Sequence, residues 1–164
     1  MSIRYAEEKD IESLLKIYNY EIENGFATFD LTPKSVEQWE QWFHCHNTGN
    51  HPLIVWDEDG TAVGYASLSG YREKEAYKST VELSVYVDNG FRGRGIGTAL
   101  MKEIIDIARK DESIHTVVSV ITSDNEGSIR LHERLGFDYC GTIPQVGEKF
   151  GRMLGICNFC LIVN

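Results

Sequence analysis

The sequence has no excess of positive charge, no apolar run long enough to span a membrane, and no repeated or low-complexity segment. Its 16 lysines and arginines are outnumbered by 25 aspartates and glutamates, so the formal net charge is -9. Binding of nucleic acid or anionic lipid needs clustered positive charge, and we therefore expect neither partner. The first residues lead into polar sequence without an apolar signal segment, which favours a cytoplasmic protein. With 164 residues and no linker, the chain is expected to form one domain, residues 1–164.

Cysteine is also scarce, and the four cysteines show no metal-binding pattern. Cys157 and Cys160 form a C-x-x-C pair in a segment that we predict to be a strand. Residues three apart on a strand point to opposite faces, so the two sulfurs would not converge, and buried strand cysteines are the better interpretation. His44-Cys45-His46 ends a predicted helix and lacks a second ligand pair at zinc-like spacing. We expect no metal site.

Hydrophobic periodicity predicts strands and helices in the order β-α-α-β-β-β-α-β-α-β-β, which is typical of an α/β protein with a mixed sheet. The predicted helices run from the cap Asp10 to Asn24-Gly25, onward from the capping box Ser35–Gln38, from about Gly95 to Lys110, and from Asp124 or Asn125 to Gly136. The predicted strands are Ile3–Tyr5, Leu53–Trp56, Ala62–Leu68, Val81–Val87, Val117–Ile121, Asp138–Thr142 and about Lys149–Val163.

The strongest functional signal is a glycine-rich junction between a predicted strand and the helix that follows it. Gly93, Gly95 and Gly97 alternate there with Arg92 and Arg94. Such glycines let backbone N–H groups converge on an anion at the N-terminus of a helix. The P-loop is excluded because no Lys-Ser/Thr pair follows, and G-x-G-x-G stands in place of the dinucleotide fingerprint G-x-G-x-x-G. A plain glycine turn with solvated arginines is the alternative to a phosphate site.

The pattern Arg92-x-x-Gly95-x-Gly97 resembles the pyrophosphate-binding motif R/Q-x-x-G-x-G/A of the GNAT superfamily of N-acetyltransferases, which bind acetyl-coenzyme A. Over almost the whole chain, further segments resemble the phosphinothricin-type acetyltransferases of that superfamily. These segments are Ile17–Asn19, Ala27–Phe29, Ala76-Tyr77, Thr80–Glu82, Ser84–Val87, Ser128–Glu133 and Lys149–Arg152. The chain departs from these relatives at Met153 and Gly155, where Trp and Asp are frequent, and at Lys74, where an Arg is frequent.

The resemblance implies a mixed, mostly antiparallel sheet flanked by helices on both faces and, by analogy, a homodimer. It also implies acetyl-coenzyme A as cosubstrate. The amine it implies is a small glutamate- or methionine-like compound, such as phosphinothricin, methionine sulfoximine or methionine sulfone. Two other functions fit the same cofactor: acetylation of a protein N-terminus or lysine, and acyl-coenzyme A sensing without catalysis.

Alkyl amines are mostly protonated at neutral pH, so acyl transfer to an amine needs a general base. Glu82 shares a strand face with Ser84 and Tyr86. If helices cover both sheet faces, Glu82 points into the protein, where burial raises the pKa of a carboxylate; a solvated glutamate is the alternative. His132, on one helix face with Ser128, is the second catalytic candidate, as a helper or proton relay, or else a core histidine.

For the cofactor, the resemblance assigns the strand backbone at positions 85–87 to the pantetheine arm, and the glycine loop suits the pyrophosphate. The expected cofactor-binding residues are Val85, Tyr86, Val87, Arg92, Gly93, Arg94, Gly95, Ile96, Gly97, Thr98, Asn125 and Ser128. Simple capping of a helix is the alternative role for Asn125 and Ser128.

For the acceptor, an amino-acid-like compound needs a cation opposite its carboxylate. Arg72 is the first candidate for this cation and Lys74 the second, and both are solvated loop residues in the alternative interpretation. Phe29, Tyr77 and Thr80 are expected to wall the acceptor pocket.

Overall fold

The computed structural model describes residues 1–164 and contains a seven-stranded sheet and four α-helices. In chain order the elements are β1 (Ser2–Tyr5), α1 (Ile11–Asn24), α2 (Val36–His44), β2 (Leu53–Glu58), β3 (Thr61–Gly70), β4 (Thr80–Val87), α3 (Ile96–Lys110), β5 (Thr116–Thr122), α4 (Glu126–Arg134), β6 (Asp138–Lys149) and β7 (Arg152–Ile162). Short 3-10 turns lie at Glu8–Asp10, Glu75–Tyr77 and Asn89–Phe91. The predicted order of elements is confirmed.

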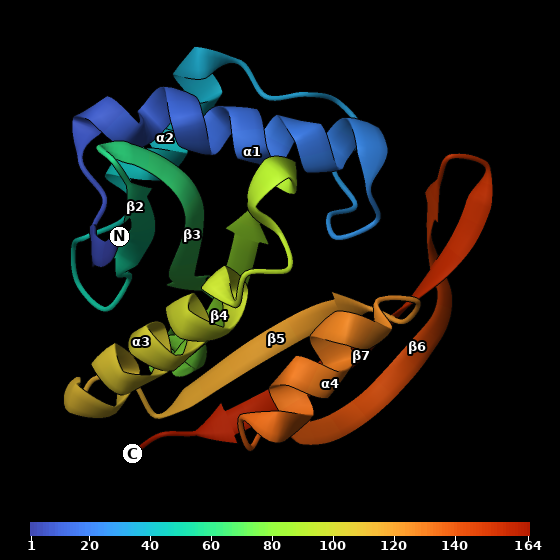
Figure 1. Cartoon of the computed structure of the whole chain (residues 1–164). Helices are drawn as coiled ribbons and strands as arrows, with labels where there is room; N and C mark the ends of the chain where they lie inside the picture. The colour runs from blue at the N-terminus through green and yellow to red at the C-terminus, as the bar shows by residue number, and fades with distance from the viewer.

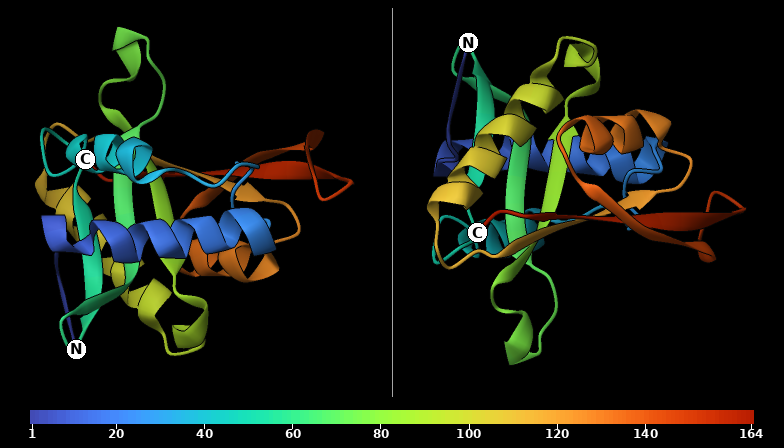
Figure 2. Two further views of the ribbon diagram at one scale, coloured as in Figure 1. Left: turned by 90° about the horizontal axis from the view of Figure 1, so that it is seen from above. Right: turned by 90° about the horizontal axis from the view of Figure 1, so that it is seen from below.

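The strands lie in the order β1-β2-β3-β4-β5-β7-β6. Every neighbouring pair is antiparallel except β4 and β5, which run parallel. Helices α1 and α2 cover one face of the sheet, and α3 and α4 lie on the other (Figures 1 and 2). The predicted mixed, mostly antiparallel sheet with helices on both faces is therefore confirmed.

Each face of the sheet has its own hydrophobic core, because successive strand residues point to opposite faces. On the α1/α2 side, nine buried residues pack together, among them Leu14, Trp39 and Tyr65. On the α3/α4 side the cluster has 19 buried residues, including Leu83 and Leu100. The alternation within β3 and β4 therefore decides which side chains face each layer, and this alternation places the functional groups described below.

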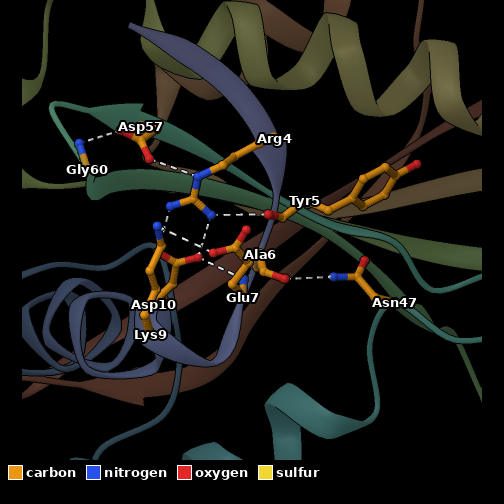
Figure 3. Close-up of polar contacts among 9 residues, drawn as sticks. All are labelled: Arg4, Tyr5, Ala6, Glu7, Lys9, Asp10, Asn47, Asp57 and Gly60. Atoms are coloured by element: carbon orange, nitrogen blue, oxygen red, sulfur yellow. Dashed lines mark hydrogen bonds and ion pairs between the residues drawn. The ribbon is translucent and has the colours of Figure 1, made fainter.

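An ionic network fastens the edge strand β1 to its surroundings (Figure 3). The Arg4 guanidinium donates to both carboxylate oxygens of Asp10, at 2.7 and 2.9 Å, and to Asp57 at 2.8 Å. Asp10 is only 2% exposed and also accepts the backbone N–H of Glu7. Asp10 stands at the N-cap of α1 as predicted, but its carboxylate is used by these partners and makes no cap hydrogen bond to α1.

The final hairpin is longer than predicted. We expected a strand to end at Thr142, but β6 continues to Lys149 and turns at Phe150-Gly151 into β7, so that the hairpin projects beyond the sheet (Figures 1 and 2). Pro144 and Gly147 interrupt the sequence pattern. The register shift between Ile143 and Gly147 absorbs them, which an edge strand tolerates because its outer side has no ladder to satisfy.

The cysteines of the C-x-x-C pair do not face each other. Cys157 is buried beside Thr142, whereas the sulfur of Cys160 lies 3.2 Å from that of Cys140 on the neighbouring strand. The structure contains no group of three or more histidine, cysteine, aspartate or glutamate side chains placed to hold a metal ion. None of its helices is long and apolar enough to cross a membrane.

Candidate active site

The sheet opens between its two parallel strands. β4 and β5 pair only at three positions, the last of which joins Glu82 to Val118. Beyond this row, residues 83–87 and 119–122 line a cavity of about 870 Å³, which we call the first cavity. The starts of α3 and α4 and the loop after α1 complete its walls. Unpaired backbone groups on the two strand edges can therefore hydrogen-bond an extended ligand that carries amide groups.

The glycine loop forms one end of the first cavity. Gly93 and Gly95 have φ angles of 77° and 79°, the left-handed region that strongly favours glycine. Gly95 stands at the N-cap of α3 without offering a side chain, so the first N–H groups of α3 are free of a side-chain cap. Gly97 and Thr98 follow in the cavity wall. Together with the helix dipole, this arrangement suits a bound anion.

The two arginines of the loop are engaged within the protein. Arg92 lines the first cavity, but its guanidinium forms an ion pair with Glu21 of α1, which is 5% exposed. Arg94 lies over the Phe91 ring, 4.8 Å from its centre, and does not line the cavity. Glu21 was missed by sequence reasoning, although a charged residue on the apolar face of α1 was a signal for it.

Glu82 lies at the row where the strands diverge and points to the α1/α2 side of the sheet. It is half-buried, and burial raises its pKa. On this side β3 and β4 form a ladder of opposed pairs: Tyr65 with Tyr86, Ser67 with Ser84, and Ser69 with Glu82. Glu82 therefore lies opposite Ser69 and two residues from Ser84, on the face of the sheet that α1 and α2 cover.

A second cavity, of about 310 Å³, lies over this ladder. Its walls are residues of α1, α2, β3, β4 and the loop between α1 and α2: Tyr18, Asp30, Lys34, Gln38, Trp39, Trp42, Tyr65, Ser67, Ser69, Ser84 and Tyr86. The Ser67 hydroxyl and the Trp39 indole N–H are buried and have no hydrogen-bond partner. Ser84 and Tyr86 line both cavities, so the two spaces adjoin at β4.

His132 lies on the opposite side of the sheet from Glu82. It is 5% exposed; its Nδ1 is 2.7 Å from the Ser128 carbonyl oxygen and its Nε2 is 2.9 Å from Ser119 Oγ. Because a carbonyl only accepts, Nδ1 carries the proton and Nε2 accepts from Ser119. Burial lowers the pKa of His132, which keeps the ring neutral. The structure does not bring His132 together with Glu82, since Ser119 follows Val118 and points away from the Glu82 face.

The other predicted residues are distributed unevenly. Asn125 and Ser128 line the first cavity, and Asn125 Oδ1 accepts the Ser128 N–H at 3.2 Å, which caps α4. Arg72 lies over the rings of Tyr71 and Tyr77, in a loop between β3 and β4 that extends away from the sheet (Figure 2).

None of the residues predicted to bind the acceptor lines either cavity: Phe29, Arg72, Lys74, Tyr77 and Thr80. Phe29 instead packs against the backbone of the β6–β7 hairpin, where a Cβ added to Gly147 would lie 2.5 Å from its ring. Apart from Tyr86, the aromatic walls of the second cavity were not predicted as site residues, although α1 and α2 carry aromatic side chains on their apolar faces.

Comparison with known proteins gives this fold and site a class, that of an acetyltransferase. The sequence pattern of the acetyltransferase (GNAT) family matches residues 15–137. The chain belongs to this family.

Similar proteins include the L-methionine sulfoximine/L-methionine sulfone acetyltransferase of Pseudomonas aeruginosa. It is 40% identical over 156 residues, which are 94% of this chain and 90% of that protein. A phosphinothricin acetyltransferase from Sinorhizobium meliloti, solved in complex with acetyl-coenzyme A, superposes with a TM-score of 0.93 at 34% identity, over 98% of this chain and 87% of that one. A ribosomal-protein-alanine N-acetyltransferase from Brucella melitensis superposes with a TM-score of 0.94 at 40% identity, over 99% of each chain.

Proposed function

We propose that this chain transfers the acetyl group of acetyl-coenzyme A to the amino group of a small amino-acid-like compound of the methionine sulfone, methionine sulfoximine or phosphinothricin type. One observation carries the proposal: the two cavities share Ser84 and Tyr86 of β4, where β4 and β5 diverge. A long cosubstrate in the first cavity and a small amine in the second would therefore meet at this strand.

The first cavity fits the cosubstrate in shape and in chemistry. Acetyl-coenzyme A, when bound, supplies an acyl thioester. The backbone N–H groups of residues 93–98 hold its pyrophosphate at the uncapped start of α3. The free edge at residues 85–87 pairs with its pantetheine amides, and Asn125 and Ser128 complete the opposite wall. Arg92 acts by tying the loop to Glu21.

Glu82 is the general base in this proposal. Glu82 lines neither cavity, but it lies two residues before Ser84 on the same strand face, and Ser84 is one of the two residues at which the cavities adjoin. Because burial raises its pKa, its carboxylate is better matched to removing a proton from an ammonium group than an exposed glutamate is. A backbone N–H of residues 85–87 stabilises the negative charge that develops on the acyl oxygen. His132 acts indirectly: its Nε2 accepts the Ser119 hydroxyl proton, so that Ser119 offers only oxygen lone pairs to the first cavity.

The second cavity suits an acceptor with a polar side chain. The unpartnered hydroxyl of Ser67 and indole N–H of Trp39 can donate to sulfone, sulfoximine or phosphinate oxygens, and a buried donor gains most from such a partner. Met153 and Gly155, which differ from the relatives, line neither cavity. Arg72 and Lys74 remain the proposed partners of the acceptor carboxylate. That role requires their loop to close over the site or a second chain to complete it.

A homodimer is part of the proposal. The projecting hairpin carries four apolar side chains that are about half exposed: Ile143, Val146, Phe150 and Met153. Apolar side chains grouped on a projecting element are expected to be covered by association.

The experiment is a thiol-release assay with acetyl-coenzyme A and a panel of amines. We expect methionine sulfone, methionine sulfoximine and phosphinothricin to be acetylated with higher kcat/KM than unmodified methionine. Peptides that present a lysine side chain or a free N-terminus should be poor substrates. Faster turnover of peptides would favour the protein-directed alternative, which the relative from Brucella melitensis represents. Tight binding of acetyl-coenzyme A without turnover of any amine would favour a sensor.

A further inference from the structure

A histidine–serine pair with no role assigned so far lies beside the second cavity, which its serine lines. His46 lies just after α2, is 8% exposed, and packs at a tilt of 42° against the Trp42 ring, with 4.3 Å between the ring centres. Its Nδ1 lies 2.7 Å from the Trp42 carbonyl oxygen, and its Nε2 lies 2.7 Å from Ser69 Oγ. Ser69 lines the second cavity, and it is the residue opposite Glu82 in the sheet.

These contacts fix the position of every proton in the pair. A carbonyl oxygen can only accept, so Nδ1 of His46 carries the ring proton. Burial lowers the pKa of His46, and His51 adds to this effect, which keeps the ring neutral and leaves Nε2 as an acceptor. The hydroxyl proton of Ser69 must therefore point to Nε2, because this nitrogen has no proton of its own to donate.

The direction of this hydrogen bond decides what Ser69 Oγ can offer to a ligand in the second cavity. Once its proton is used by His46, Ser69 Oγ can only accept hydrogen bonds from whatever occupies the cavity. Residues opposed across antiparallel strands have Cβ atoms about 4.5–5.5 Å apart, so the side chains of Ser69 and Glu82 start from neighbouring points on the same face of the sheet. Two neighbouring groups that only accept suit a ligand group with two or more N–H donors, and repel one that offers lone pairs.

We propose that Ser69 binds the amino group of the acceptor beside Glu82, and that His46 is a positioning residue that acts through Ser69. The inference rests on the proposed function, because it assumes that an amine occupies the second cavity. One N–H of the amine is held by Ser69 while another faces Glu82, which orients the nitrogen toward the first cavity.

The proton positions can be tested without turnover. In ¹⁵N NMR spectra of the whole protein at neutral pH, with the signals assigned through His46→Gln, we expect His46 to carry its proton on Nδ1 and to have a bare Nε2. Ser69→Ala should shift the Nε2 signal of His46 and leave that of His132 in place. A proton on Nε2, or a charged ring, would overturn the proposal.

The functional link can be tested by a double-mutant cycle with a turned-over amine. Ser69→Ala and His46→Phe should each lower kcat/KM for the amine about tenfold, through loss of one hydrogen bond to a charged group, with unchanged affinity for coenzyme A. In the Ser69→Ala background, His46→Phe should have no further effect on kcat/KM. With Ser69 intact, His46→Gln should keep most of the activity that His46→Phe loses, because the glutamine amide oxygen can accept the Ser69 hydroxyl proton.

The matched control is His44→Phe, since His44 is exposed and pairs only with Glu8 on the surface. Additive losses in the cycle would show that His46 serves packing alone and would refute its positioning role. If the wild type binds coenzyme A but acetylates no amine, the proposed function fails and takes this inference with it. If the wild type acetylates an amine but the losses from Ser69→Ala and His46→Phe are additive, the proposed function stands and only the inference about His46 is refuted.

Discussion

At the scale of single residues, Glu82 occupies the last row in which β4 and β5 remain paired. Its carboxylate is half-buried and forms no salt bridge, and burial raises its pKa because the charged form is poorly solvated. The residue therefore resembles many catalytic carboxylates, in which a group that costs stability is kept because its protonation is useful.

Glu82→Gln is expected to lower kcat by about 10²–10⁴-fold, the usual contribution of a general base, with coenzyme A affinity unchanged. In the wild type, activity should fall as pH drops through the raised pKa of Glu82, above the range of an exposed glutamate, and this acid limb should vanish in the variant. Measuring kcat against pH for both proteins decides the point. Wild-type activity in the variant would remove Glu82 from the mechanism.

The raised pKa of Glu82 also predicts how the stability of the fold depends on pH and on the substitution Glu82→Gln. Because the pKa of Glu82 is higher in the folded than in the unfolded state, folding is most favoured below the ordinary carboxylate pKa and weakens as pH rises through the raised one. At pH 7 the ionised group is therefore a net cost. Glu82→Gln should unfold at a higher urea concentration than the wild type at pH 7, and a lower midpoint would contradict this.

Gly95 is the residue on which the cosubstrate site depends. Its left-handed backbone would cost alanine about 1–2 kcal/mol, so Gly95→Ala should lose about that much stability and bind coenzyme A at least about tenfold more weakly. Gly49 has a φ of 56° but lies outside both cavities, and Gly49→Ala should lose stability alone. Calorimetric titration with coenzyme A compares them. Equal affinities in the two variants would contradict the pyrophosphate assignment.

At the scale of elements, one arginine holds β1 at the sheet edge. Arg4 links β1 to Asp57 at the end of β2 and to the buried Asp10 before α1, as Figure 3 shows. The Arg4 guanidinium lowers the pKa of Asp57 through a hydrogen bond to its carboxylate. Removing Arg4 would leave Asp10 buried without a counter-charge, which is the costly way to break an ion pair.

Arg4→Met should therefore reduce the free energy of unfolding by about 3 kcal/mol, measured by urea denaturation. Arg109 forms an exposed pair with Asp106 within α3, and Arg109→Met should change stability by no more than about 0.5 kcal/mol. Similar small effects for both variants would show that the β1 network is not a major source of stability.

Sequence patterns predicted the helices and strands well where the pattern depended only on neighbouring residues. The glycine junction, the alternation of β4 and the capping box of α2 were read directly from neighbouring residues. Pro144 and Gly147 concealed the extension of β6, because register shifts in an edge strand leave no periodic signal. The second cavity was also missed. It depends on pairing Ser69 with Glu82 and on packing α2 over β3, which are long-range contacts that no local pattern specifies.

At the scale of the whole molecule, the hairpin β6–β7 extends beyond the layers (Figure 2). Its exposed apolar side chains face solvent. If these side chains form the proposed dimer interface, Val146→Glu should convert a dimer to a monomer in sedimentation experiments, because it would bury a charge. Coenzyme A affinity should persist, since Val146 lines neither cavity. A monomeric wild type would contradict the dimer proposal.

The central claim for the whole molecule is that two ligands reach β4 from opposite sides of the opened sheet. A crystal structure with coenzyme A and methionine sulfone tests it most directly. We predict the pyrophosphate against the backbone of residues 93–98 and the amino group within hydrogen-bond distance of Glu82. An amino group on the α3/α4 side, beside His132, would contradict the account.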